Sequence, residues 1–125
     1  MVLKCILIMA GGALGAIARF GVSATANRVY GTGFPVGTLL VNLAGCFLIG
    51  LFFIMAEEKV ITANMRLFLV TGFLGALTTF STYAFESVAA TRDGMTSVAI
   101  LNLAANNVGG LLLVLAGMWL GRYVV

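Results

Sequence analysis

The chain has 125 residues, of which 62% are hydrophobic and only 9% are charged. A soluble domain is about 45–50% apolar and about 25% charged, so this composition predicts an integral membrane protein of one domain. Seven basic and four acidic residues give a net charge of +3, too small and too dispersed for a nucleic-acid surface. Histidine, the commonest general base and metal ligand, is absent, and no stretch suits a soluble catalytic domain, so we expect no enzyme.

The first predicted span covers residues 3–26. It begins like a signal peptide, with Lys4, an apolar run and a small-x-small pattern, but its apolar run continues to full spanning length. Gly11 and Gly15 are spaced so that another helix backbone can approach closely. Arg19 has two interpretations, because it could snorkel to the lipid headgroups or line a vestibule that attracts anions.

The second predicted span covers residues 38–56 and is apolar except for Asn42. A buried amide costs free energy unless it is hydrogen-bonded, so Asn42 either holds helices together or contacts a transported substrate. The two cysteines, Cys5 and Cys46, lie in apolar stretches, and we expect them to be small hydrophobic residues rather than a disulfide or a metal pair.

The third predicted span, residues 64–90, is longer than the roughly 20 residues that a straight helix needs. It is either tilted, or an unbroken helix whose hydroxyls bond to its own carbonyls, or two half-helices joined by non-helical residues 75–79. We favour the break, because it would free carbonyls that can coordinate a cation and amides that can attract an anion.

The second half of this span is unusually polar for a membrane helix. Phe80 and Tyr83 lie three residues apart, a spacing that is also typical of ordinary core packing. Glu86 is either a hydrogen-bonded acid near a helix end or an acceptor that tunes pore donors by bonding to Thr82 or Tyr83.

The fourth predicted span covers residues 96–121. Asn102, Asn106 and Gly109 fall at i, i+4 and i+7, so they share one helix face that favours a polar interior over lipid. The basic residues show little bias between the two membrane sides, which permits insertion in both orientations. One side would hold Lys4, Lys59, Arg66 and Arg122. The other would hold Arg28 and Arg92, with Arg19 as a third candidate.

Three stretches resemble the Fluc, or CrcB, fluoride channels. They are residues 72–83 (Gly-Phe-Leu-Gly-Ala-Leu-Thr-Thr-Phe-Ser-Thr-Tyr), residues 37–45 (Gly-Thr-Leu-Leu-Val-Asn-Leu-Ala-Gly), and residues 12–20 with Arg19. The resemblance implies an all-α membrane protein with four spans, a broken third helix and an antiparallel dual-topology homodimer in a prokaryotic inner membrane. It also implies passive fluoride efflux through two pores, which lowers cytoplasmic fluoride and its toxicity.

The resemblance further assigns residues to two sites. The main-chain carbonyls of Gly75 and Thr78 would hold a structural Na⁺ that is not transported. The implied fluoride-pore residues are Asn42, Thr79, Phe80, Ser81, Thr82 and Tyr83. The implied vestibule or supporting residues are Arg19, Thr38, Glu86, Asn102 and Asn106. Neutral donors and aromatic C–H edges suit an anion that must leave as readily as it enters.

Several positions depart from the family pattern. Tyr83 stands where phenylalanine is usual, and Ala76 replaces a glycine beside the sodium position. Asn102, Asn106 and Gly110 occupy positions that carry tyrosine, serine or histidine, and serine in other members. The family's roles therefore apply less directly to the polar residues of the fourth span than to the other implied site residues.

Two other functions remain as alternatives. A small proton-coupled multidrug transporter would need a membrane-embedded acid in the first span, where this sequence has Arg19 and no acid. A non-transporting assembly subunit would explain the glycine packing surfaces but not the hydroxyls between Thr78 and Tyr83.

Overall fold

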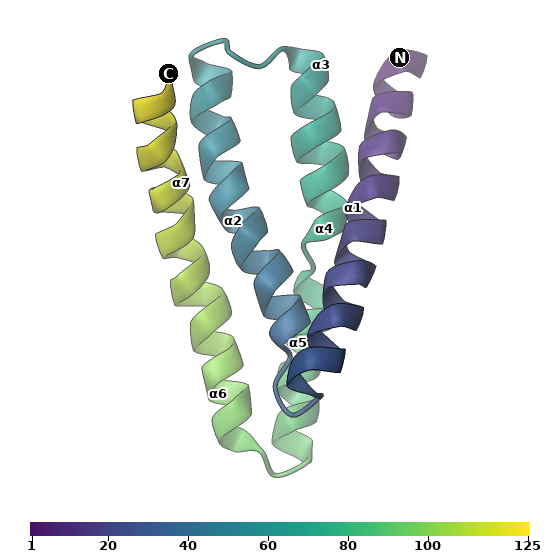
Figure 1. Ribbon diagram of the computed structural model, residues 1–125, viewed down its shortest axis with the longest axis vertical. Helices are drawn as coiled ribbons and strands as arrows, with labels where there is room; N and C mark the ends of the chain where they lie inside the picture. Colours follow the sequence, from purple (N-terminus) through teal and green to yellow (C-terminus); the bar gives the residue numbers. More distant parts are fainter.

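The computed structural model describes all 125 residues and is entirely helical (Figure 1). Four helical segments are long and apolar enough to cross a membrane: Val2–Tyr30, Val36–Glu57, Ala63–Arg92 and Thr96–Val124. The shortest has 22 residues, which at 1.5 Å per residue extends about 33 Å, enough for a hydrocarbon core of about 30 Å. The predicted all-helical, four-span architecture is confirmed; the fourth helical segment begins at its predicted residue, and the other ends extend one to four residues beyond the predicted ones.

The first two spans are single α-helices, and the last two are composite. The first and second are α1 (Val2–Tyr30) and α2 (Val36–Glu57). The third comprises α3 (Ala63–Arg66), the π-helix η1 (Leu67–Leu74), α4 (Gly75–Leu77) and α5 (Phe80–Arg92). The fourth comprises α6 (Thr96–Ala104), the π-helix η2 (Ala105–Gly109) and α7 (Gly110–Val124). Nothing in the sequence predicted the π-helical turns, which are rare and often occur at functional sites.

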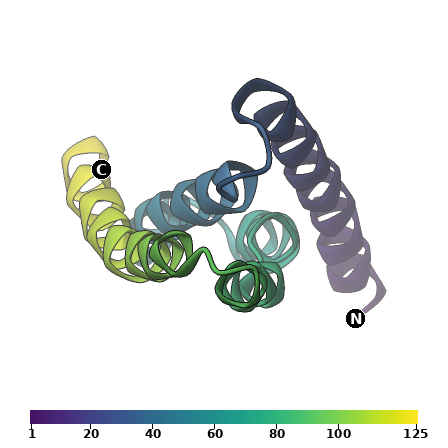
Figure 2. The ribbon, with the colours of Figure 1, turned by 90° about the horizontal axis from the view of Figure 1, so that it is seen from below.

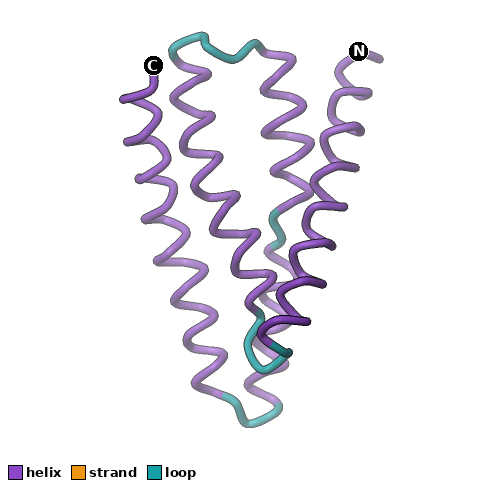
Figure 3. Tube along the Cα trace, viewed as in Figure 1, coloured by secondary structure: helices purple, strands orange, loops and turns teal.

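The termini and the α2–α3 loop lie at one end of the molecule, and the other two loops lie at the opposite end (Figure 1). The helix α2 packs along α7, and α1 packs along η1. Seen along the bundle, α1 and α7 lie on opposite flanks of the third span (Figure 2). The trace shows one interruption inside a span, between α4 and α5 (Figure 3).

Glycines allow the closest helix contacts. A Cβ on Gly11 or Gly15 would collide with the backbone carbonyl of Phe68 or Phe73 in η1, which confirms the close approach predicted from their spacing. Where α2 meets α7, a Cβ on Gly117 would collide in the same way with the carbonyl of Phe47. These positions fix how near the helix axes can lie.

Gly117→Val should lower the free energy of unfolding by about 1–3 kcal/mol, because backbone cannot retreat from the added atoms without separating α2 from α7. Denaturant titration of the protein in detergent micelles measures this change. Gly21→Val is the matched control, since a Cβ there meets no atom within 4 Å. Equal losses in the two variants would contradict the packing explanation.

Candidate functional site

The third span is interrupted at two residues. The helix α4 ends at Leu77, Thr78 and Thr79 have extended backbone (φ −82°, ψ 156° and φ −151°, ψ 115°), and α5 begins at Phe80. Gly75 is helical, so the predicted non-helical stretch 75–79 was wrong in its first three residues.

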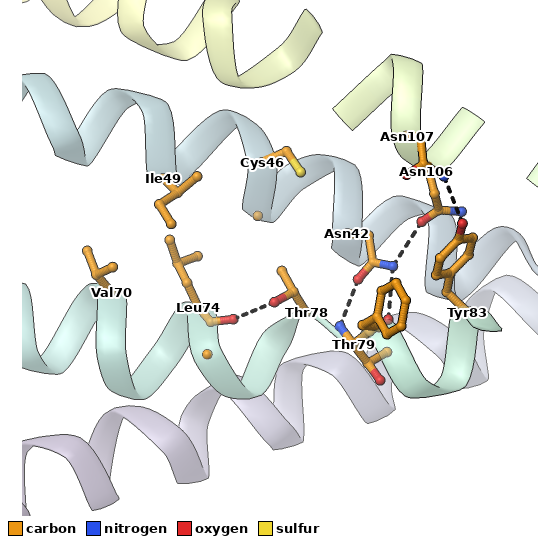
Figure 4. Close-up of a pocket in the computed structure, with 13 residues that line it drawn as sticks. Asn42, Cys46, Ile49, Val70, Leu74, Thr78, Thr79, Tyr83, Asn106 and Asn107 are labelled. Carbon is orange, nitrogen blue, oxygen red and sulfur yellow. Dashed lines mark hydrogen bonds between the residues drawn. The ribbon is translucent and has the colours of Figure 1, made fainter. Parts of the chain in front are cut away.

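The side chain of Asn42, in α2, bonds to the backbone at the interruption (Figure 4). The amide N–H of Thr79 donates to Asn42 Oδ1 at 2.8 Å, and Asn42 Nδ2 donates to the carbonyl of Thr79 at 3.1 Å. In an unbroken helix the Thr79 amide would instead bond to the Gly75 carbonyl. Asn42 thus satisfies backbone groups that lipid could not, which supports its predicted role in holding helices together.

A chain of side-chain amides continues from Asn42 into the fourth span. Asn42 Nδ2 also donates to Asn106 Oδ1 at 2.9 Å, and Asn106 Nδ2 donates to Asn102 Oδ1 at 2.8 Å. Asn102, which is 1% exposed, donates to Ser87 Oγ at 2.9 Å. The asparagine face predicted for the fourth span therefore faces α2 and α5, and its amides bond to one another.

The two aromatic residues of the site differ in burial. Tyr83 is 6% exposed, whereas Phe80 is 78% exposed on the outside of this chain. Their ring centroids lie 5.5 Å apart in an edge-to-face arrangement. Asn107 Nδ2 donates to Tyr83 Oη at 2.7 Å, which ties the phenol to the π-helix η2.

Hydroxyl groups surround the start of α5. Thr79 Oγ1 accepts from the Thr82 backbone amide at 3.3 Å, as an N-cap does, and donates to Thr82 Oγ1 at 3.0 Å. Ser81 Oγ lies 3.4 Å from Thr79 Oγ1. Ser81 and Thr82 are exposed on the surface of the chain.

Arg19, in α1, contacts the backbone of the interruption. Its Nη1 donates to the Thr78 carbonyl over a long distance of 3.5 Å, and its side chain is half-buried. The Thr78 hydroxyl donates back to the Leu74 carbonyl at 3.0 Å. The guanidinium is thus beside the predicted carbonyl site, more than two helical turns from the nearer end of α1.

Glu86 bonds to a residue that was not expected to be its partner. Thr38 Oγ1, in α2, donates to Glu86 Oε1 at 2.7 Å, and Glu86 Oε2 is buried with no partner in the chain. The predicted bonds from Thr82 or Tyr83 to this acid are therefore wrong. The partner Thr38 lies on another helix, and a spacing rule for one helix could not have identified it.

A cavity of about 360 Å³ opens beside the interruption (Figure 4). Its lining contains no charged side chain and consists of Asn42, Gly45, Cys46, Ile49, Val70, Leu74, Gly75, Thr78, Thr79, Phe80, Tyr83, Asn106 and Asn107. The predicted residues outside this lining are Arg19, Thr38, Ser81, Thr82, Glu86 and Asn102.

Asn107 is the polar lining residue that sequence reasoning missed. In an ideal α-helix it would be rotated by about 100° from Asn106 and would leave the shared face. Both asparagines lie in η2, whose turns are wider, and both reach the cavity. An extra amide inside an apolar span was the only signal available in the sequence.

Comparisons with known proteins identify the family. Residues 6–118 match the model of the family described as CrcB-like protein, Camphor Resistance (CrcB). The chain is 41% identical to a fluoride-specific ion channel FluC of Maridesulfovibrio salexigens, over 98% of each chain. It is 44% identical to the one of Hydrogenovibrio crunogenus, covering 97% of this chain and 92% of that one. The chain belongs to the CrcB-like family, as its sequence resemblance indicated.

Proposed function

We propose that this protein is a fluoride-specific channel that lets fluoride leave the cell passively and so limits its toxicity. The observation that carries the proposal is its 41–46% identity, over nearly the whole chain, to relatives that are named fluoride-specific ion channels. We further propose the inner membrane of a prokaryote as its location, since these relatives are bacterial.

The cavity has the chemistry that an anion pathway requires. Fluoride is strongly hydrated, so a pore must replace its water with hydrogen-bond donors. The lining contains polar side chains but no charged one, and it includes the Tyr83 hydroxyl and the aromatic edges of Phe80 and Tyr83. Neutral donors favour conduction, because a cationic side chain that bonded directly to fluoride would hold it too tightly to release it.

We propose that two copies assemble as an antiparallel, dual-topology homodimer. Gly75, Ser81 and Thr82 are exposed near the middle of the third span, next to the interruption. Polar groups and broken backbone do not face lipid in a membrane, so this surface needs protein or water against it. A second copy would cover it, and the weak charge bias between the two sides permits either orientation.

We propose Na⁺ as a structural ion at the interruption, held by the main-chain carbonyls of Gly75 and Thr78. The Gly75 carbonyl has lost its helical partner, because the Thr79 amide donates to Asn42. The Thr78 carbonyl accepts only a long bond from Arg19. Carbonyl oxygens are suitable ligands for a hard cation, and two copies would supply four of them. The bound ion would neutralise these dipoles inside the membrane.

The channel proposal predicts rapid fluoride efflux and little chloride efflux from liposomes that contain the purified protein. A fluoride-selective or chloride-selective electrode measures each rate, and empty liposomes give the background. Equal efflux of both anions, or no efflux of either, would refute the proposal. Fluoride efflux that requires an opposing proton gradient would instead support a proton-coupled transporter, for which Glu86 is the available acid in the third span.

A further inference from the structure

The amide of Asn42 has no hydrogen available for an anion. The backbone N–H of Thr79 is a fixed donor, so the atom facing it must be Asn42 Oδ1. Asn42 Nδ2 therefore points the other way, and its two hydrogens go to the Thr79 carbonyl and to Asn106 Oδ1. The most conspicuous polar residue of the second span is thus fully used in holding the interruption together.

The other amides in the cavity are used in the same way. The two Nδ2 hydrogens of Asn106 go to the backbone carbonyl and to the Oδ1 of Asn102. The two Nδ2 hydrogens of Asn107 go to Tyr83 Oη and to the Leu103 carbonyl. None of the three asparagines that line the cavity has a free N–H in this arrangement.

Among the hydroxyls that line the cavity, only that of Tyr83 has a hydrogen that is not already donated to another group of the chain. The Thr78 hydroxyl donates to the Leu74 carbonyl, and the Thr79 hydroxyl donates to Thr82 Oγ1. Tyr83 Oη accepts from Asn107, so its own hydrogen points elsewhere, and the structure gives that hydrogen no acceptor within the chain. The thiol of Cys46 also lines the cavity, but S–H is a weak donor.

We infer that the Tyr83 hydroxyl is the hydrogen-bond donor that meets fluoride in this cavity, and that Asn107 is its positioning residue. This inference rests on the proposed channel function. By donating to Oη, Asn107 occupies an acceptor site of the oxygen and directs the O–H hydrogen away from η2. A donated bond also polarises the hydroxyl and strengthens the bond that it can give. The free O–H would therefore bond to an anion that accepts hydrogen bonds strongly, as fluoride does.

The first test is Tyr83→Phe, which removes the hydroxyl and keeps the ring. Fluoride efflux from liposomes is measured over a series of fluoride concentrations, with size-exclusion elution to check folding. We expect the half-saturating concentration to rise about tenfold, since a hydrogen bond to a charged group contributes about 1.5 kcal/mol or more. Tyr123→Phe is the matched control, because that phenol lies exposed near the end of α7, away from the cavity, and we expect no change. An unchanged concentration dependence in Tyr83→Phe would overturn the inference.

The second test separates positioning from packing. Asn107→Leu keeps a side chain of similar size and removes the donor to Oη, and we expect about a threefold rise in the half-saturating concentration. In the Tyr83→Phe background the same change should have no further effect on that concentration, which a packing role would not explain. Asn64→Leu, at an exposed position in α3, is the control. Equal effects of Asn107→Leu in the two backgrounds would overturn the positioning role.

These outcomes are distinguishable from failure of the channel proposal. If the parental protein gives no selective fluoride efflux, the channel proposal fails. If the parental protein conducts and Tyr83→Phe conducts equally well, only the donor inference fails. Should Tyr83→Phe not fold, Asn107→Leu in the parental background decides alone, since unchanged efflux there would overturn the inference.

Discussion

Asn42→Asp should abolish fluoride efflux while the protein still enters the membrane. One carboxylate oxygen can keep the bond from the Thr79 amide, but the other would face the Thr79 carbonyl and Asn106 Oδ1, two acceptors now bonded at 3.1 and 2.9 Å. The new charge would also lie in the lining of the cavity. At an effective dielectric of about 20, a unit charge 4 Å from a permeating anion costs about 4 kcal/mol, or roughly a thousandfold in rate.

The liposome assay with a fluoride electrode measures this loss. Asn64→Asp introduces the same charge at an exposed position in α3 and should conduct like the parental protein. Size-exclusion elution in detergent separates a blocked channel from an unfolded one. Parental efflux in Asn42→Asp would show that the ion path does not pass Asn42.

Phe80→Ile should lower fluoride efflux by about tenfold. The ring of Phe80 lines the cavity, is 78% exposed from this chain and meets Tyr83 edge to face. Its ring hydrogens carry partial positive charge, which aliphatic C–H groups lack. Isoleucine is comparably hydrophobic, so the change removes the polarised edge and keeps an apolar surface.

Phe85→Ile is the matched control for this variant. Phe85 is on the same helix and is 72% exposed, but it does not line the cavity. Both variants lose one exposed aromatic ring from α5. A lower efflux rate in Phe80→Ile than in Phe85→Ile therefore shows that the ring matters at the cavity, and not that any lost ring slows efflux. Equal rates in the two variants would mean that the aromatic edge at position 80 plays no part in conduction.

The spans could be predicted from the sequence because hydrophobic length is a local property of each segment. The close approach of α1 to η1 could be predicted as well, since Gly11 and Gly15 leave one surface of α1 without side chains. The interruption was expected from glycines and hydroxyls, but its position at Thr78 and Thr79 depends on Asn42 in another helix. Local spacing could not supply that contact.

The same limit explains the errors at the site. One of the two interpretations of Glu86 placed its partner on its own helix, whereas the partner Thr38 lies 48 residues away in the sequence. The role of Asn107 was missed because the ideal helical period fails in η2. The pore, sodium and vestibule residues implied by the resemblance remain predictions, and the mutations above test those at Asn42, Phe80 and Tyr83.

The bonds between Asn42 and Thr79 have a consequence for biogenesis. The backbone N–H and carbonyl of Thr79, in the third span, have hydrogen-bond partners only when the side chain of Asn42, in the second span, bonds to them. If the third span entered lipid alone, its exposed backbone groups would each cost several kcal/mol, which favours a continuous helix. The interruption therefore depends on the pairing of the second and third spans, and we expect it to form only after the two inserted helices have met.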